Sequence, residues 1–173
     1  MPGKHTKQFP PIAAFVYRPD EDASSLLVQV AHLLRAKDVV VAGAVQHHDG
    51  PCQMSLEIFP SGRRLSISQP LAKAGSCKLD TGALAEAAAE VRQAIDGKPQ
   101  LAIFNKFGAQ EAGGDGMRAE MAAAVVADVA LLTAVSEELL PQWVAFTGGN
   151  DVRLPCRPEA ALDWWESLNK RKY

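Results

Sequence analysis

The chain lacks the features of a secreted or membrane-spanning protein. Its 173 residues include only three cysteines, which are widely spaced and odd in number. That pattern fits neither a disulfide framework nor a CxxC metal site, so we expect reduced thiols. No apolar run reaches the roughly 18 residues that a membrane-spanning helix needs. The polar start also lacks the apolar region of a secretory signal, and we therefore expect a cytoplasmic protein without membrane insertion.

The chain also lacks an excess of positive charge. Its net charge is −2 and its pI is near 6.1, which predicts that it does not bind nucleic acid. The basic run 170–172 fits the favourable end of a helix dipole. The run 47–49 with Cys52 contains metal-binding residue types, but its spacing matches no known site, and a solvated turn explains it better. We predict no metal site.

Apolar runs and helical patterns alternate along the chain. The pattern predicts a flexible tail over residues 1–11 and a single α/β domain over residues 12–173. We expect a three-layer fold in which a mostly parallel sheet carries helices on both faces. The expected strands are 12–17, 39–45, 101–104, 130–135 and 152–154, with a small β-hairpin insertion formed by 54–59 and 64–68. The expected helices are 26–34, 81–95, 116–127, 136–147 and a last one from residue 158.

A glycine-rich loop at residues 105–116 follows one of these strands and precedes a helix. Ligands bind at such junctions in α/β sheets, because the following helix offers unpaired N–H groups and a positive dipole end. Arg118 stands in the first turn of the expected helix, where a cation is unfavourable for the dipole. We therefore expect a local partner for it, either Glu111, Asp115 or an anionic ligand.

Several segments together resemble a known bacterial family. They are 12–17, 39–46, 77–80, the stretch Asn105-Lys106-Phe107-Gly108 with Glu111, Gly116 and Arg118, and 143–149. The chain resembles a family of unknown function whose genes often lie beside molybdate-transport genes. Its members are sometimes described as similar to nucleoside triphosphatases. The resemblance implies a fold like that of P-loop nucleoside triphosphatases and an association with molybdenum.

The loop after the first expected strand departs from a working P-loop. A P-loop needs glycines, a lysine and a hydroxyl to hold phosphates and Mg²⁺. Residues 17–25 contain three carboxylates and neither glycine nor lysine. Only Arg18 and the hydroxyls of Ser24 and Ser25 favour an anion there. Asn105 also stands where a magnesium-binding carboxylate is expected, so ordinary ATP or GTP hydrolysis is not predicted.

Two functions and a third alternative follow from this pattern. The first is a nucleotide- or oxyanion-binding domain that does not hydrolyse its ligand and is accessory to molybdenum uptake or use. The second is a phosphohydrolase with Glu111 or Asp80 as base. The third is a protein–protein adaptor whose ligand site has decayed. Such an adaptor could bind either a second copy of itself or another protein. The ligand-binding candidates are Arg18, Ser24, Ser25, Lys78, Asn105, Lys106, Gly108, Gly116 and Arg118.

Overall fold

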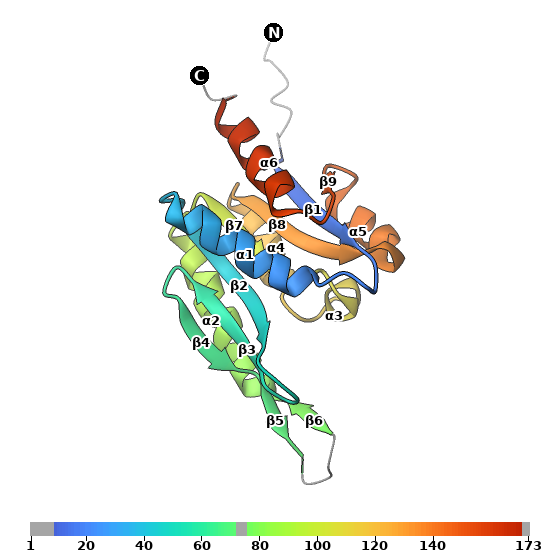
Figure 1. The fold of residues 1–173 in the computed structure, drawn as a ribbon. Helices are drawn as coiled ribbons and strands as arrows, with labels where there is room; N and C mark the ends of the chain where they lie inside the picture. Colours follow the sequence, from blue (N-terminus) through green and yellow to red (C-terminus); the bar gives the residue numbers. More distant parts are fainter. Residues whose placement is uncertain (1–8, 72–75, 171–173) are drawn as a thin grey trace.

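Strands and helices alternate along the computed structural model, which describes residues 9–71 and 76–170 (Figure 1). The strands are β1 (Ile12–Tyr17), β2 (Val41–His48), β3 (Met54–Phe59), β4 (Arg63–Ser66), β5 (Ser68–Pro70), β6 (Cys77–Leu79), β7 (Leu101–Phe104), β8 (Ala130–Ser136) and β9 (Val152–Leu154). The helices are α1 (Ala23–Ala36), α2 (Thr81–Asp96), α3 (Ala109–Ala112), α4 (Arg118–Val126), the 3₁₀ turn η1 (Glu137–Leu139), α5 (Leu140–Thr147) and α6 (Pro158–Lys170). Within these residues no helix is long and apolar enough to cross a bilayer.

Seven strands form one sheet in the order β4-β3-β2-β7-β8-β1-β9. The five strands from β2 to β9 in this order run parallel, and β3 and β4 continue the sheet as an antiparallel hairpin at its β2 side. β5 and β6 form a separate two-stranded ribbon, which lies at the lower end of the view in Figure 1. The predicted mostly parallel α/β fold is confirmed, and it is consistent with a P-loop-NTPase-like fold.

Helices cover both faces of the sheet. One core cluster holds the buried faces of α1 and α6, including Leu27 and Trp165. The other holds those of α2, α4 and α5, including Val91 and Trp143. The central strands are buried on both sides, which explains why they appear in the sequence as nearly continuous apolar runs rather than alternating ones.

Carboxylates cap the two longest helices. Asp22 Oδ1 accepts the Ser25 N–H at 3.0 Å at the start of α1. Asp80 Oδ1 accepts the Ala83 N–H at 3.0 Å at the start of α2. Each cap satisfies a backbone donor that the first turn of a helix leaves without a partner.

The structure differs from the expected elements in two places. β2 runs on to His48, where the sequence suggests a turn, because His47 faces inward and its Nε2 lies 2.8 Å from Glu57 Oε1 on β3. The short helix α3 was not predicted, and the helix expected from residue 116 begins at Arg118. Gly113, Gly114 and Gly116 hide α3 from a pattern-based prediction, since glycine weakens a helical signal.

Trp164 and Trp165, which are adjacent in α6, are both buried. Their side chains are only 7% and 8% exposed. Their ring centroids lie 6.5 Å apart, and both rings belong to the core cluster that also contains α1. Two adjacent helix positions can both be buried here because α6 packs against the sheet and against α1.

The prediction that all thiols are reduced is wrong, because Cys52 and Cys77 form a disulfide. Their Cα atoms lie 5.3 Å apart although 25 positions separate them in sequence. The bond joins the β2–β3 turn to β6. Sequence spacing gave no sign of it, since the contact depends on how the β5–β6 ribbon folds back. Cys156 is free and half-buried, and burial, followed by the nearby Glu21, raises the pKa of its thiol to about 11.

Loss of the disulfide should lower stability. A cross-link that closes a loop of this size restricts the unfolded chain, so Cys52→Ser is expected to cost about 3 kcal/mol in the free energy of unfolding. Urea denaturation of the variant and of the wild type, each with and without a dithiol reductant, measures the loss. Cys156→Ser is the matched control and should remain sensitive to reductant. Three reactive thiols in the unfolded, unreduced wild type would contradict the bond.

Candidate functional site

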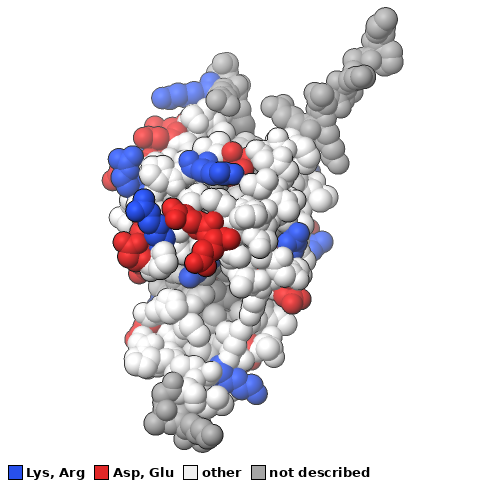
Figure 2. All heavy atoms as spheres, turned by 90° about the vertical axis from the view of Figure 1, so that its right-hand side faces the viewer, with Lys and Arg blue, Asp and Glu red and all other residues white. Residues whose placement is uncertain are grey.

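The carboxyl ends of the parallel strands form one edge of the sheet. The loops after β1, β2 and β7 leave the sheet at this edge, where open α/β sheets bind their ligands. Figure 2 views the molecule from the side on which α3 and β6 lie in Figure 1. Acidic and basic side chains alternate over its upper half, and no broad patch of one sign is present on that face.

Backbone hydrogen bonds fix the loop after β7. The Asn105 N–H donates to Ala44 O at 2.8 Å, and the Phe107 N–H donates to Ala134 O at 2.7 Å. The loop is therefore attached to both neighbouring strands. Lys106, between these two anchors, has a φ of 36°, a left-handed conformation that is uncommon for a non-glycine residue.

An aromatic cluster holds Phe107 in place. Its ring is fully buried, and its centroid lies 5.2 Å from that of Trp143 and 5.5 Å from that of Phe146. The guanidinium of Arg118 lies over the Phe146 ring at 5.2 Å and donates to Glu111 O at 2.9 Å. This contact supplies the local partner that the sequence predicts for Arg118, although it is the backbone of Glu111 and not its carboxylate.

The Glu111 carboxylate closes the glycine-rich loop. Oε2 accepts the Gly108 N–H at 3.0 Å, and Oε1 accepts the Met117 N–H at 3.3 Å. Gly116, between these two donors, has a φ of 58°, and a Cβ atom at this position would overlap the carboxylate. Glycine is therefore required at position 116 for the loop to wrap around Glu111.

A cavity of about 470 Å³ lies between α2, the ends of β2 and β7, and this loop. That volume suits a small organic ligand. The lining is mostly apolar, with amides at one side. It consists of Ala44, Gln46, Leu56, Ile67, Leu79, Thr81, Leu84, Ala85, Ala88, Asn105, Lys106, Gly108, Ala109, Gln110, Glu111, Gly116 and Met117.

An amide pair lies at the sheet side of the cavity. Asn105 Nδ2 donates to Gln46 Oε1 at 3.0 Å. Gln46 Nε2 in turn lies 3.0 Å from His48 Nε2 and 3.4 Å from Met54 Sδ. Asn105 Oδ1 is buried and has no donor among the described residues. A buried acceptor without a partner is unusual and requires an explanation.

Charged groups lie at the rim of the cavity. Lys106 Nζ is 5.9 Å from the centroid of the Tyr17 ring. Burial, followed by the negative charge of Glu111, raises the pKa of Tyr17 above its ordinary value. Tyr17 is thus a neutral hydroxyl at physiological pH and a weak proton donor.

Several polar groups of the loop after β1 are engaged in contacts within the protein. Both oxygens of Asp22 are bound to Ser25, with Oδ2 accepting the Ser25 hydroxyl at 2.7 Å. The Arg18 N–H donates to Glu21 Oε1 at 3.0 Å, and its guanidinium lies 3.5 Å from Glu137. The Ser24 hydroxyl is buried and has no hydrogen-bond partner within the described residues.

The structure brings only some of the predicted site residues together. Four of the nine binding candidates line the cavity, together with Glu111: Asn105, Lys106, Gly108 and Gly116. Lys78 is exposed on β6 and does not line it. Asp80, the other candidate base, caps α2, and its Oδ2 accepts from Gln69 Nε2 at 3.3 Å. Gln46 and the α2 face were not predicted, because a glutamine near a strand end and alanines on a helix carry no specific signal.

A second polar cluster also escaped the sequence analysis. Glu57 Oε1 lies 2.9 Å from His32 Nε2 and 2.8 Å from His47 Nε2. Burial opposes the charge on Glu57, but hydrogen bonds from both histidines outweigh it and lower the pKa of this carboxyl. Among the residues described, no group of three or more His, Cys, Asp or Glu side chains is arranged to hold a metal ion.

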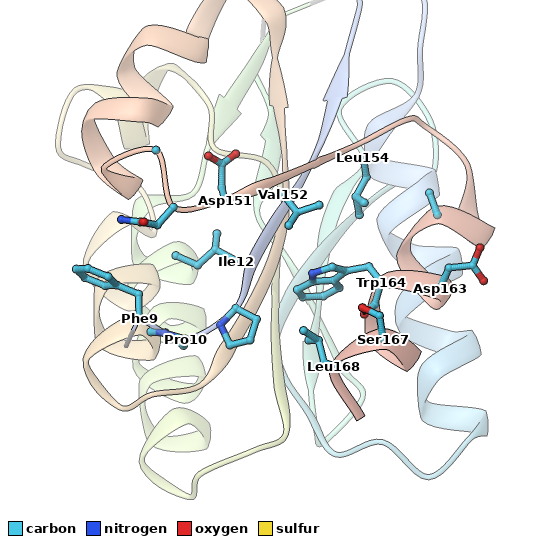
Figure 3. Close-up of a pocket in the computed structure, with 14 residues that line it drawn as sticks. Phe9, Pro10, Ile12, Asp151, Val152, Leu154, Asp163, Trp164, Ser167 and Leu168 are labelled. Atoms are coloured by element: carbon cyan, nitrogen blue, oxygen red, sulfur yellow. The ribbon is translucent and has the colours of Figure 1, made fainter. Parts of the chain in front are cut away.

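A larger cavity of about 1100 Å³ lies near the beginnings of β1 and β9 and beside α6. Figure 3 shows Ile12 and Val152 on one side of it and Trp164 and Leu168 on the other. None of the predicted site residues lines this cavity. The smaller cavity is the better candidate, since it lies at the carboxyl edge and contains the Asn105–Glu111 loop.

The Asp22 cap should stabilise the protein in a pH-dependent way. Its hydrogen bonds from the Ser25 side chain and backbone lower the pKa of Asp22. The contribution is therefore complete above the unfolded pKa of about 3.9 and is lost as the pH falls through the lower folded pKa. Asp22→Ala is expected to cost about 1 kcal/mol at pH 7. Urea denaturation from pH 7 to pH 3 should show the two proteins converging, whereas an unchanged difference would contradict the ionised cap.

Removal of the Glu111 carboxylate should open the glycine-rich loop. Glu111→Ala leaves the Gly108 and Met117 N–H groups without an acceptor and is expected to cost about 2 kcal/mol. Glu111→Gln keeps one acceptor oxygen and should lose less. Asp115→Ala, on the exposed part of the same loop, is the control. Chemical denaturation measures all three, and an unaffected Glu111→Ala protein would show that the carboxylate does not hold the loop.

Comparison with known proteins supports the resemblance drawn from the sequence. A family model described as "Protein of unknown function (DUF2478)" matches residues 12–164. The curated protein "Molybdenum import ATP-binding protein ModC 2" of Bradyrhizobium diazoefficiens is 39% identical over 166 residues. The match covers 92% of this chain but 18% of that relative. No solved structure matches the chain. Because the family model extends over most of its length, the chain belongs to this family of proteins of unknown function.

Proposed function

We propose that the protein is a nucleotide- or oxyanion-binding module that assists molybdenum uptake or use and does not hydrolyse its ligand. The observation that carries the proposal is the cavity at the carboxyl edge, which is lined by Asn105, Lys106 and the loop that Glu111 closes. Ligands of α/β sheets bind at this edge.

The loop after β1 supports binding without hydrolysis. In a P-loop, backbone N–H groups and a lysine surround the phosphates. In this chain the Asp22 carboxylate occupies the first turn of α1, and Glu21 accepts the Arg18 N–H. Phosphate would meet negative charge there. At the end of β7, Asn105 is neutral and its one carbonyl oxygen is enclosed by the protein, so it is a poor ligand for Mg²⁺.

The molybdenum association rests on the relative. That protein's name describes an ATP-binding protein of molybdenum import, and a segment 39% identical to this chain forms part of it. The chain spans less than a fifth of that relative's length. Segments of one polypeptide commonly serve the same process, so the related segment of that protein is expected to serve molybdenum import. We extend this association to the present chain because of its similarity to that segment.

The hydrolase alternative is weaker. Its base would be Glu111 or Asp80, and in each the carboxylate already accepts backbone N–H groups that the loop or helix end needs. A general base must reach the proton of a substrate or a water molecule. A carboxylate engaged in capping is less available for that task. No observation on the described residues specifically favours the adaptor alternative.

A thermal-shift screen with a parallel turnover assay tests the proposal. The probes are ATP, GTP, pyrophosphate, molybdate, tungstate and sulfate, each with and without Mg²⁺. Binding to the folded state alone raises the apparent melting temperature, and a ligand at 100 times its Kd adds about 2.7 kcal/mol. We expect a shift with at least one probe that does not require Mg²⁺, together with no release of phosphate from ATP or GTP.

Three results would each overturn part of the proposal. Release of phosphate that disappears in Glu111→Gln, while that variant remains folded, would establish the hydrolase alternative. No shift with any probe would exclude the binding function. The molybdenum link is measured separately, as the molybdenum content of cells lacking the gene at limiting molybdate. Unchanged content would remove that part of the proposal.

A further inference from the structure

We infer that the cavity beside α2 binds a planar nitrogen heterocycle of the nucleobase type, held at its edge by Asn105, and that it does not bind a free oxyanion. This inference rests on the proposed function and selects between the two ligand classes named there. Three properties of the cavity support it: the charge of its lining, the chemistry of its amide pair and the character of its opposite wall.

The lining cannot compensate a multiply charged anion. Lys106 and Glu111 are the charged side chains among its residues, so their charges cancel. Both Glu111 oxygens accept backbone N–H groups, and the carboxylate therefore stays in place beside any ligand. Burial of an anion without matching cations is strongly unfavourable. Phosphate, molybdate and sulfate are poor occupants for this reason.

The amide pair offers a hydrogen-bond donor to the edge of a nucleobase. The contact of Gln46 Nε2 with Met54 Sδ orients the Gln46 amide so that its oxygen faces Asn105 Nδ2. Oδ1 of Asn105 is enclosed by the protein, so Asn105 has one remaining N–H to offer to a ligand. That N–H can donate to an acceptor nitrogen on the edge of a heterocycle such as a nucleobase.

The opposite wall is apolar and suits the face of a ring. Leu84, Ala85 and Ala88 contribute from α2, and Leu56 and Ile67 contribute from the β3 side. Burial of a flat ring between such side chains gains roughly 25 cal/mol per Å² of apolar surface. Lys106 at the rim remains able to meet a phosphate that projects outward, so a nucleotide can bind with its base inside and its phosphates in solvent.

Isothermal titration of the full chain tests the inference. The probes are adenosine, guanosine, cytidine and uridine, which carry no phosphate, together with AMP, molybdate and orthophosphate. We expect at least one nucleoside to bind and its monophosphate to bind within about tenfold of it. Neither molybdate nor orthophosphate should bind at this cavity.

Two variants locate the bound ligand. Ala85→Phe places a ring in the cavity from an exposed position of α2, and Asn105→Ala removes the edge contact. Each is expected to weaken nucleoside binding tenfold or more. Ala89→Phe, at another exposed position of α2 outside the lining, is the matched control and should bind as the wild type does. Because Ala85 is exposed, its substitution tests the cavity even where Asn105→Ala fails to fold.

The outcomes separate this inference from the proposed function. If AMP, molybdate or orthophosphate binds and no nucleoside does, the inference of a heterocyclic ligand is wrong. The proposed function as a binding module would remain. Nucleoside binding that Ala85→Phe leaves unchanged would also overturn it, because the ligand would then lie elsewhere. A failure of every probe to bind, those of the thermal-shift screen included, would overturn both.

Discussion

The loop after β7 depends on one carboxylate. Glu111 accepts N–H groups from both sides of the glycine-rich stretch, at Gly108 and at Met117. Without it, two donors would lack partners, and only the backbone bonds within the loop and the contact of Arg118 with Glu111 O would hold the loop closed. This loop forms one wall of the cavity, and α2 forms another. The constraint also explains Gly116, since a side chain there would occupy the space of the carboxylate.

The same fold places an amide pair in the cavity and only one cation, Lys106, which the charge of Glu111 balances. Asn105 ends β7 at a position where hard cations are bound in related architectures, and here its nitrogen is committed to Gln46. The Phe107 ring, buried against Trp143, fixes the loop that carries both Asn105 and Lys106. The charged group of Lys106 therefore lies at the rim of the cavity, and the amides of Gln46 and Asn105 lie at its sheet side. That division favours a ligand with an uncharged body.

Much of the fold could be predicted from the sequence, and much of the site could not. The strand at 101–104 and the helix at 81–95 depend on patterns of neighbouring residues and were predicted correctly. The Cys52–Cys77 bond depends on how a ribbon folds back across 25 positions. The contact of His32 with Glu57 spans the same distance in sequence. Local pattern contains no information on such pairs, because they depend on the register of strands and the placement of helices.

The carboxylates of the crevice have a common role that their positions in the sequence conceal. Asp22 and Asp80 each stand between a strand and a helix, and Glu111 lies in the short helix α3 that follows β7, positions where acids are often catalytic. In the structure each accepts a backbone N–H at the beginning of a helix or loop. Those N–H groups are the ones that hold phosphate in phosphate-binding loops. Where a protein's own carboxylate accepts one of these N–H groups and adds negative charge, the helix end attracts phosphate less, so the proposed ligand site relies on the amides and on the apolar face of α2.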